Sequence, residues 1–320
     1  MTERAAIQLR RVAMACLVAI VLMVAADLAP ASGAVVPVCD SEFLTLSHPV
    51  CAQRVVDGLG EIVDLTVTDS GDIHVLGADG TIAAVRPGAE VETAHFQLPG
   101  ALLLEAGYRS LLVGTHDGVS RHRFARGELV PEVEGEQVVA DRPSSLALAR
   151  LGRLFVATSA ADCDGSCDEV RVFDALDASP AAGRQILPTD GRVLALDAMA
   201  GRDLVLGLVA SEGRTVLTSI GDHHGGCVTE ECVSATVPIA GDHSSMVIVP
   251  GDELGFDEQI ALVASGHEVW SVFFEGGGAV SVELLVASPG AAFQVASSPE
   301  GETYVADASG GIVWRLWAER

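Results

Sequence analysis

The chain has 320 residues, of which 49% are hydrophobic, and it carries 19 basic and 44 acidic side chains. This composition excludes a disordered chain, a collagen-like repeat and a small disulfide-rich domain, because a chain of this length and apolar content buries a large core. The net charge of −25 disfavours nucleic acid and anionic lipid as partners, since an acidic surface repels phosphate groups. We therefore expect a monomer whose protein or small-molecule partner, if it has one, is cationic.

The first 34 residues are typical of a secretory signal peptide. Arg4, Arg10 and Arg11 precede an apolar run of 15 residues at 12–26, and small residues follow it. Two alternatives stay open: an uncleaved membrane anchor, which usually needs about 20 apolar residues, and twin-arginine export. We expect the mature protein to be periplasmic or extracellular and to have no membrane span. Its net charge is then −26, because residues 1–34 hold three arginines and two acids.

Six cysteines follow the predicted signal peptide, in three neighbouring pairs. An even count in an exported chain predicts disulfide bonds, and the short spacings favour local pairing. The predicted bonds are Cys39–Cys51, Cys163–Cys167 and Cys227–Cys232. A zinc site at the last pair, with His223 and His224, is the alternative. The acids around the middle pair are expected to form a solvated turn; they are Asp162, Asp164 and Asp168.

The mature chain repeats one unit of three apolar strands separated by turns. The repeats occupy residues 62–87, 102–124, 145–175, 192–220, 245–274 and 293–317. A small residue ends the second strand of each unit, and these residues recur every 37 to 57 positions. Such a spacing is typical of a propeller blade rather than of a helical repeat. The sequence therefore predicts an all-β protein, a six-bladed β-propeller with four-stranded blades and almost no helix.

The two ends of the mature chain are expected to close this ring. The last repeat ends at Trp317 with only three strands, and residues 53–56 form a spare strand before the first repeat. Pairing these segments removes the open sheet edges that a propeller otherwise leaves. The predicted organisation is a signal peptide over residues 1–34, a disulfide-stapled lead-in over 35–51 and a propeller over 52–320.

The last repeat resembles known propeller families. The string SSPEGETYVADASGGIVWRLW (297–317) contains a turn with Pro and Gly, a strand ending in Val-Ala-Asp, and a turn into an outer strand. It is similar to NHL repeats and to blades of the senescence-marker and gluconolactonase-like propellers. That resemblance implies the propeller architecture of residues 52–317 and, as in lactonases and lyases, a metal ion at the channel. The asparagine ligand of those families has no counterpart, because the chain contains no asparagine.

Polar residues are expected to gather on one face of the propeller. There the loops between blades, and those between second and third strands, surround the central channel. These loops carry Asp79, His116, Asp117, Asp141, Arg142, Asp190, Arg192, Asp242, His243, His267, Glu268 and Asp307. Carboxylates bind Ca²⁺ and imidazoles bind transition metals. The predicted metal ligands, for Ca²⁺ above all, are Asp242, His243, His116, Asp117 and Glu268. Arg142 and Arg192 are the competing partners of these acids.

Three hypotheses for function follow from the sequence. A propeller that binds a protein or small molecule is favoured, because varied loops without a recurring catalytic set suit a recognition scaffold. A metal-dependent hydrolase, lactonase or lyase is the first alternative, and a structural component of the envelope is the second. No catalytic residue is assigned, and Ca²⁺ is the only cofactor considered.

Overall fold

A computed structural model shows the protein as a β-propeller. The chain divides into two units, Met1–Pro37 and Val38–Arg320, and every described residue belongs to the second. The structure describes residues 44–47, 50–88, 91–149, 152–160, 167–174, 185–189, 191–199, 204–222, 225–226, 234–237, 244–256, 259–274, 280–288 and 292–318. The predicted signal peptide lies outside these residues.

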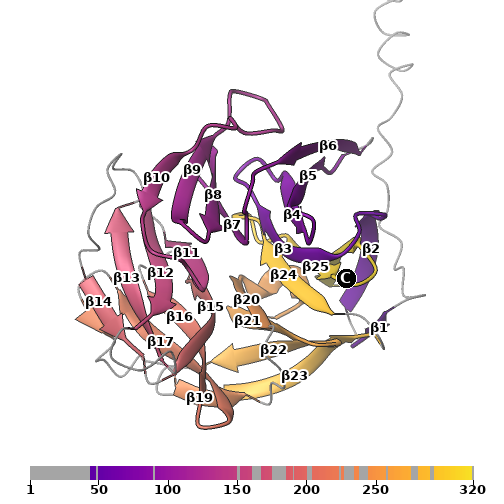
Figure 1. Cartoon of the computed structure of the whole chain (residues 1–320). Coiled ribbons are helices and arrows are strands. Elements are labelled where there is room, and N and C mark those ends of the chain that lie inside the picture. Colours follow the sequence, from indigo (N-terminus) through magenta and orange to yellow (C-terminus); the bar gives the residue numbers. More distant parts are fainter. Residues whose placement is uncertain are drawn as a thin grey trace, which may run out of the picture. The chain divides into compact units, whose positions relative to one another are not determined.

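Three blades form the first half of the ring (Figure 1). Blade 1 comprises β3 (Ile62–Val67), β4 (Ile73–Gly77), β5 (Thr81–Arg86) and β6 (Glu92–Gln97). Blade 2 comprises β7 (Leu103–Gly107), β8 (Ser110–Thr115), β9 (Gly118–Arg123) and β10 (Glu136–Val139). Blade 3 comprises β11 (Ser145–Ala149), β12 (Arg153–Ser159), β13 (Asp168–Asp174) and β14 (Gln185–Pro188).

Three further blades complete it. Blade 4 comprises β15 (Arg192–Ala198), β16 (Val205–Ser211), β17 (Arg214–Asp222) and β19 (Ser234–Val237), with the short β18 (Gly225–Gly226) also on β17. Blade 5 comprises β20 (Ser244–Val249), β21 (Ile260–Ser265), β22 (Glu268–Phe274) and β23 (Val280–Ala287), with β1 (Thr45–Leu46) on β23. Blade 6 comprises β24 (Phe293–Ser297), β25 (Thr303–Asp307), β26 (Ile312–Ala318) and β2 (Val50–Val56).

The first strand of each blade lies at the centre of the ring. These inner strands contact one another in the order β3, β7, β11, β15, β20, β24 and back to β3, and Figure 1 shows them around the axis. Neighbouring strands within each blade are antiparallel. The helical content of the described residues is one 3₁₀ turn, Gly251–Leu254. The prediction of six blades is therefore confirmed, and blade 4 carries one additional two-residue strand, β18.

The core lies between the blades because the middle strands are apolar on both faces. Residues Ile260 to Val263 in β21 are fully buried, as expected for a continuous apolar run with a neighbour on each side. Between blades 1 and 2, Leu76 packs in one cluster with Leu104 and Leu111. Burial of apolar surface at such junctions stabilises the ring by about 25 cal/mol per Å².

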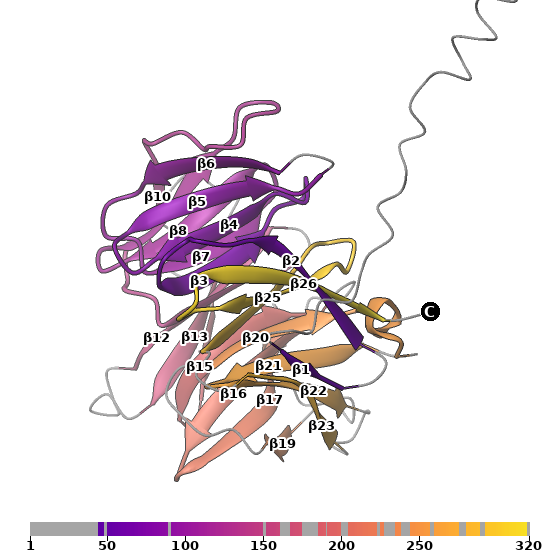
Figure 2. The ribbon, with the colours of Figure 1, turned by 90° about the vertical axis from the view of Figure 1, so that its right-hand side faces the viewer.

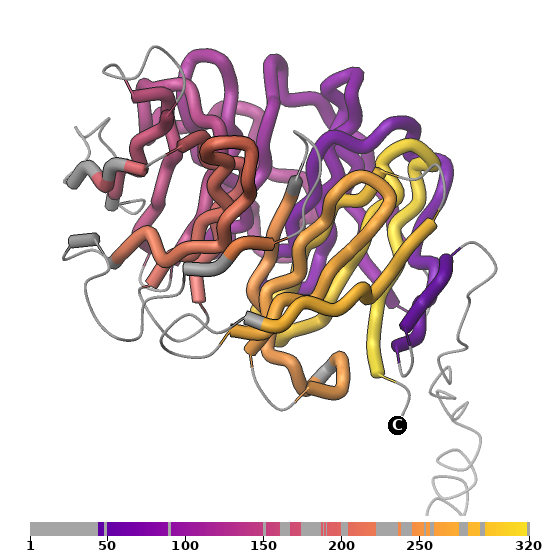
Figure 3. The backbone as a smooth tube through the Cα atoms, turned by 90° about the horizontal axis from the view of Figure 1, so that it is seen from below, coloured from indigo at the N-terminus to yellow at the C-terminus, as the bar shows by residue number. Residues whose placement is uncertain are grey.

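The N-terminal strand β2 closes the ring. It pairs with β26, with Gln53 opposite Arg315 and Cys51 opposite Trp317. Figures 2 and 3 show this junction, where the start of the described chain runs beside its end. The predicted closing strand at residues 53–56 is confirmed, although it begins earlier, at Val50. The strand β1, which extends blade 5, was not predicted because two residues carry no periodic pattern.

Both cysteines in the described part of the chain, Cys51 and Cys167, form disulfide bonds. Their partner sulfurs lie outside the described residues, as do Cys227 and Cys232, so all three pairings stay predictions. Mass mapping of the unreduced protein is expected to find Cys39–Cys51, Cys163–Cys167 and Cys227–Cys232, because short loops close with least loss of entropy. A bond joining two different pairs would contradict the local pairing.

The described part of the chain contains no helix that is both long enough and apolar enough to cross a bilayer.

Candidate functional site

A cavity of about 1420 Å³ occupies the centre of the ring, and we call it the central channel. All six inner strands contribute to its wall, most of which is apolar. At one end, the turns between the first and second strands of the blades form the rim. The rim includes Asp69, Tyr108, Arg109, Gly152 and Pro299. A pocket of this kind, with a few polar groups converging on it, is the usual setting of a ligand site.

Three of the five predicted metal ligands, His116, Asp117 and Glu268, do not lie at this channel. His116 and Asp117 are exposed on the β8–β9 turn of blade 2, whereas Glu268 begins β22 in blade 5, on the opposite side of the ring. None of these three side chains lines the cavity. Asp242 and His243 lie outside the described residues. Within the described ranges, no group of three His, Cys, Asp or Glu side chains is placed to hold a metal ion.

Three acidic residues stand instead on the inner strands, and we call them the acid belt. Asp64 lies in β3, Glu105 in β7 and Asp197 in β15, and all three are half-buried at the channel wall. Each interrupts a strand that is otherwise mostly apolar. The belt therefore places carboxylates from blades 1, 2 and 4 around one cavity.

Each belt carboxylate accepts a backbone hydrogen bond from the next blade. The Asp64 carboxylate accepts the N–H of Leu104 at 2.7 Å. Glu105 Oε1 accepts the N–H of Leu148 at 3.0 Å, and Asp197 Oδ2 accepts that of Ile248 at 2.5 Å. The side chains thus join neighbouring blades while their residues line the channel. This geometry holds the acids in fixed positions on the wall.

Two serines make equivalent links where the belt has no acid. Ser145 Oγ accepts the N–H of Leu196 at 2.9 Å, and Ser245 Oγ accepts that of Val295 at 3.0 Å. The sequence shows Ser-Ser at the start of both repeats, and the structure explains the second serine of each pair. From blade 6 to blade 1 the link is a backbone bond, from Ile62 N–H to the Ala308 carbonyl at 2.8 Å.

The acid belt has strongly shifted pKa values. Desolvation by burial raises the pKa of Asp64 and of Asp197 from 3.8 to about 7, although two backbone N–H groups oppose the shift at each. Burial also raises the pKa of Glu105 well above 4.5, and the charges of Asp197 and Asp64 add to this. All three side chains are only partly exposed, at the wall of the cavity, so desolvation is the largest cause of the shifts. Among the described residues no cation contributes to the pKa shifts of the belt, which makes it a candidate site for a positive or hydrogen-donating group.

Asp168 corrects one expectation from the sequence. It was expected in a solvated turn, but its side chain is only 3% exposed. The carboxylate accepts the N–H of Val193 at 2.7 Å and so joins blade 3 to blade 4. Burial raises its pKa, against the opposing effects of this hydrogen bond and of Arg192. Arg192 lies near this junction, and neither it nor Arg142 lines the channel.

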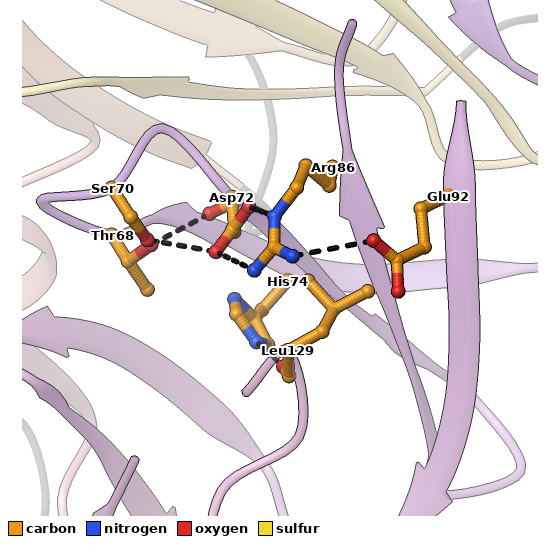
Figure 4. A network of polar contacts seen from close by, with 7 residues as sticks. All are labelled: Thr68, Ser70, Asp72, His74, Arg86, Glu92 and Leu129. Atoms are coloured by element: carbon orange, nitrogen blue, oxygen red, sulfur yellow. Dashed lines mark hydrogen bonds and ion pairs between the residues drawn. The ribbon is translucent and has the colours of Figure 1, made fainter. Parts of the chain in front are cut away.

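A polar network fixes the rim of blade 1 (Figure 4). The guanidinium of Arg86 donates two hydrogen bonds to Asp72, Nε to Oδ1 at 2.7 Å and Nη2 to Oδ2 at 3.0 Å. Ser70 Oγ also donates to Asp72, at 2.7 Å. Burial raises the pKa of Asp72, but the bonds from Arg86 and Ser70 outweigh burial and lower it. The pair is satisfied within the protein, so we assign it to stabilising the turn at residues 68–72.

The rim of blade 2 carries two exposed side chains, Tyr108 and Arg109. Tyr108 is 77% exposed, and Arg109 adopts a left-handed backbone conformation with φ of 50°. The Arg109 carbonyl accepts the N–H of Phe124 at 3.0 Å, and the carboxylate of Asp69 accepts the N–H of Arg109. We call Tyr108 and Arg109 the rim turn. It presents a ring and a guanidinium on a fixed backbone at the mouth of the channel.

No protein-family model and no curated protein matches the sequence. The fold is similar to solved propeller structures. The PQQ domain of pyranose dehydrogenase from Coprinopsis cinerea has a TM-score of 0.65 at 10% identity, over 86% of this chain and 97% of that chain. The Trichoderma reesei carbohydrate-active enzyme of family AA12 has a TM-score of 0.67 at 11% identity, and the match covers 87% of this chain and 98% of that chain. Escherichia coli aldose sugar dehydrogenase has a TM-score of 0.55 at 13% identity, and the match covers 84% of this chain and 100% of that chain.

At these identities the similarity establishes the fold, a six-bladed β-propeller. It does not support the narrower resemblance to NHL and gluconolactonase-like propellers, since the similar structures are those of sugar dehydrogenases and an AA12 enzyme. The specific family expected from residues 297–317 is therefore unsupported, whereas the propeller architecture is confirmed.

The cofactor named for some of these structures, PQQ, does not fit the described channel. PQQ carries three carboxylates, and the acid belt would repel them. Among the described residues that line the cavity, the basic side chains are Arg109, Arg121 and Arg123, and the last two are already paired with Glu136. One free guanidinium does not balance three carboxylates, so we derive no step through this cofactor.

One signal in the sequence points to the acid belt and was not used for the predicted site. In three of the six repeats an acid interrupts the first strand, as in IVDLTV, LLLEAG and VLALDA. In a propeller this strand lies at the centre of the ring, so an acid that recurs there faces other blades or the channel.

Proposed function

We propose that this protein is an exported ligand-binding propeller whose central channel takes a small molecule with an ammonium group. The observation that carries the proposal is the acid belt in a cavity of about 1420 Å³, with no cation among the groups that shift its pKa values. Buried carboxylates that repel one another are stabilised in their charged form by a positive ligand. The net charge of −25 also attracts cations toward the molecule.

Glu105 is the belt residue best placed to contact a ligand. Only its Oε1 is used by a backbone bond, from Leu148, whereas both oxygens of Asp64 and of Asp197 accept backbone N–H groups. Glu105 also stands between two other negative charges, since both raise its pKa. An ammonium group at Glu105 would therefore gain one charge-assisted hydrogen bond and the attraction of two further carboxylates.

The test compares two probes that differ only in the ammonium group, trialanine amide and N-acetyl-trialanine amide. Calorimetry at pH 7 is expected to show binding of the first probe and none of the second. Glu105→Gln keeps an oxygen for the Leu148 N–H but removes the charge, so trialanine amide should bind at least about tenfold more weakly.

Glu268→Gln serves as the matched control, because this acid lies outside the channel wall. It is expected to leave the affinity unchanged. Equal binding of both probes, binding of neither, or an unchanged affinity in Glu105→Gln would each overturn the proposal.

A further inference from the structure

We infer that the rim turn, Tyr108 and Arg109, recognises an acidic group of the ligand, so that the channel selects a zwitterion such as a short peptide with a free carboxyl end. This inference rests on the proposed function, because it assumes that the ammonium end lies at the acid belt. It assigns the opposite end of the ligand to the mouth of the channel.

The backbone conformation of the rim turn indicates that the Arg109 side chain has a function. The corresponding turns between the first and second strands of blades 1, 3 and 6 place glycine in the left-handed conformation. Their φ values are 79° at Gly71, 74° at Gly152 and 95° at Gly301. At blade 2 an arginine holds φ of 50° in such a turn, where a side chain is strained. A residue kept in a strained conformation beside a cavity is a candidate for function.

The guanidinium of Arg109 is also available to a ligand. Other arginines near the channel are paired, Arg121 and Arg123 with Glu136 and Arg86 with Asp72. Within the described residues no ion pair joins Arg109 to an acid, and only its backbone is engaged. A free guanidinium binds a carboxylate through two parallel hydrogen bonds.

Two neighbours hold the turn in place. The carboxylate of Asp69 accepts the backbone N–H of Arg109, and Asp69 itself belongs to the turn that the Asp72 and Arg86 pair stabilises. Phe124 donates its N–H to the Arg109 carbonyl. The turn therefore presents its two side chains without the loss of backbone freedom that a flexible loop would suffer on binding.

The spacing fits a peptide of about three residues. Gly107 pairs with Ser110, so Tyr108 and Arg109 form the two-residue turn at the end of β7, about three residues or 10 Å along the strand from Glu105. An extended tripeptide spans about 10 Å between its termini, which matches this separation. Tyr108, beside Arg109, offers an aromatic face to the last side chain of such a ligand.

The test uses trialanine and trialanine amide, which differ only in the terminal carboxylate. Both are titrated into the protein as it is exported. We expect trialanine to bind the native protein at least tenfold more tightly than its amide. Arg109→Gly should abolish this preference without lowering the affinity for trialanine amide. The same variant should raise the melting temperature by a few degrees, because glycine relieves the strain at φ of 50°.

Glu212→Gly is the matched control, since Glu212 has φ of 49° in the β16–β17 turn and does not line the channel. It should raise the melting temperature in the same way and leave both affinities unchanged. If trialanine amide binds but Arg109→Gly leaves the preference for trialanine intact, or no preference exists, the rim inference is wrong and the proposed function stands. If neither probe binds the native protein, the proposed function itself fails.

Discussion

Trp314→Ala is expected to lower the free energy of unfolding by about 3–5 kcal/mol, through lost burial and the cavity left behind. Trp314 is 1% exposed and lies in β26, which pairs with β25 on one side and with the closing strand β2 on the other. For a domain of this size the loss corresponds to a fall of about 10 °C in melting temperature. The effect is large because this side chain packs in the core beside the sheet that joins the two ends of the ring.

Trp317→Ala provides the comparison, since Trp317 lies in the same strand and is only partly buried. It is expected to cost less than half as much. Urea unfolding of the three proteins, followed by tryptophan fluorescence and circular dichroism, gives both values. Equal losses for the two variants would contradict the assignment of Trp314 to the core of the closing sheet.

The protein is expected to lose stability as the pH rises from 4 to 8. Asp64 and Asp197 have folded pKa values of about 7 against an ordinary value of 3.8. A carboxyl whose folded pKa is raised stabilises the fold fully below its unfolded pKa, and this contribution is lost as the pH rises through the folded value. Because channel water screens these side chains, we expect about 2 kcal/mol from each, half of the full linkage.

Other groups act in the opposite direction but at lower pH. Burial lowers the pKa of His74 and of His122, so their contributions are lost only as the pH falls below 6.5. The pKa values of Asp72, Asp79 and Glu136 are also lowered, and their contributions are lost as the pH falls below the ordinary values of 3.8 to 4.5. The interval from pH 6.5 to 8.5 therefore reports mainly the acid belt.

Glu105→Gln is expected to reduce the pH dependence in that interval and to raise stability at pH 8.5. The substitution removes a carboxyl whose pKa lies well above its ordinary value and which repels Asp64 and Asp197. Chemical denaturation at several pH values measures the slope, with Glu268→Gln as the control that keeps it. A native protein that gains stability from pH 6.5 to 8.5, or the same slope in Glu105→Gln, would contradict this interpretation.

The architecture could be predicted from the sequence because it follows from local patterns that recur. Apolar strands, turns and the small residue that ends each second strand repeat six times, and each repeat became one blade. The closing strand was predictable for the same reason, since a blade with three strands requires a fourth. The two-residue strand β1 was not, because its position depends on the edge of β23.

The channel site could not be predicted in the same way because it depends on which strand faces the axis. Polar loop residues such as His116 and Glu268 stood out in the sequence, but they occupy blades on opposite sides of the ring. Asp64 and Glu105 are inconspicuous along the chain, and the ring brings them to one wall. The hydrogen bonds that hold them cross between blades about 40 residues apart, which no local pattern reveals.

Proton release on ligand binding tests the central claim, that the acid belt binds an ammonium group. At pH 6.5 the amine of trialanine amide is already protonated, whereas Asp64 and Asp197 are largely protonated because their pKa values are about 7, and burial raises the pKa of Glu105 well above its ordinary value. Calorimetry of trialanine amide in buffers of different ionisation enthalpy is therefore expected to show release of about one proton per ligand, and clearly less in Glu105→Gln. Binding without proton release, or the same release in Glu105→Gln, would contradict the assignment of the ligand to the acid belt.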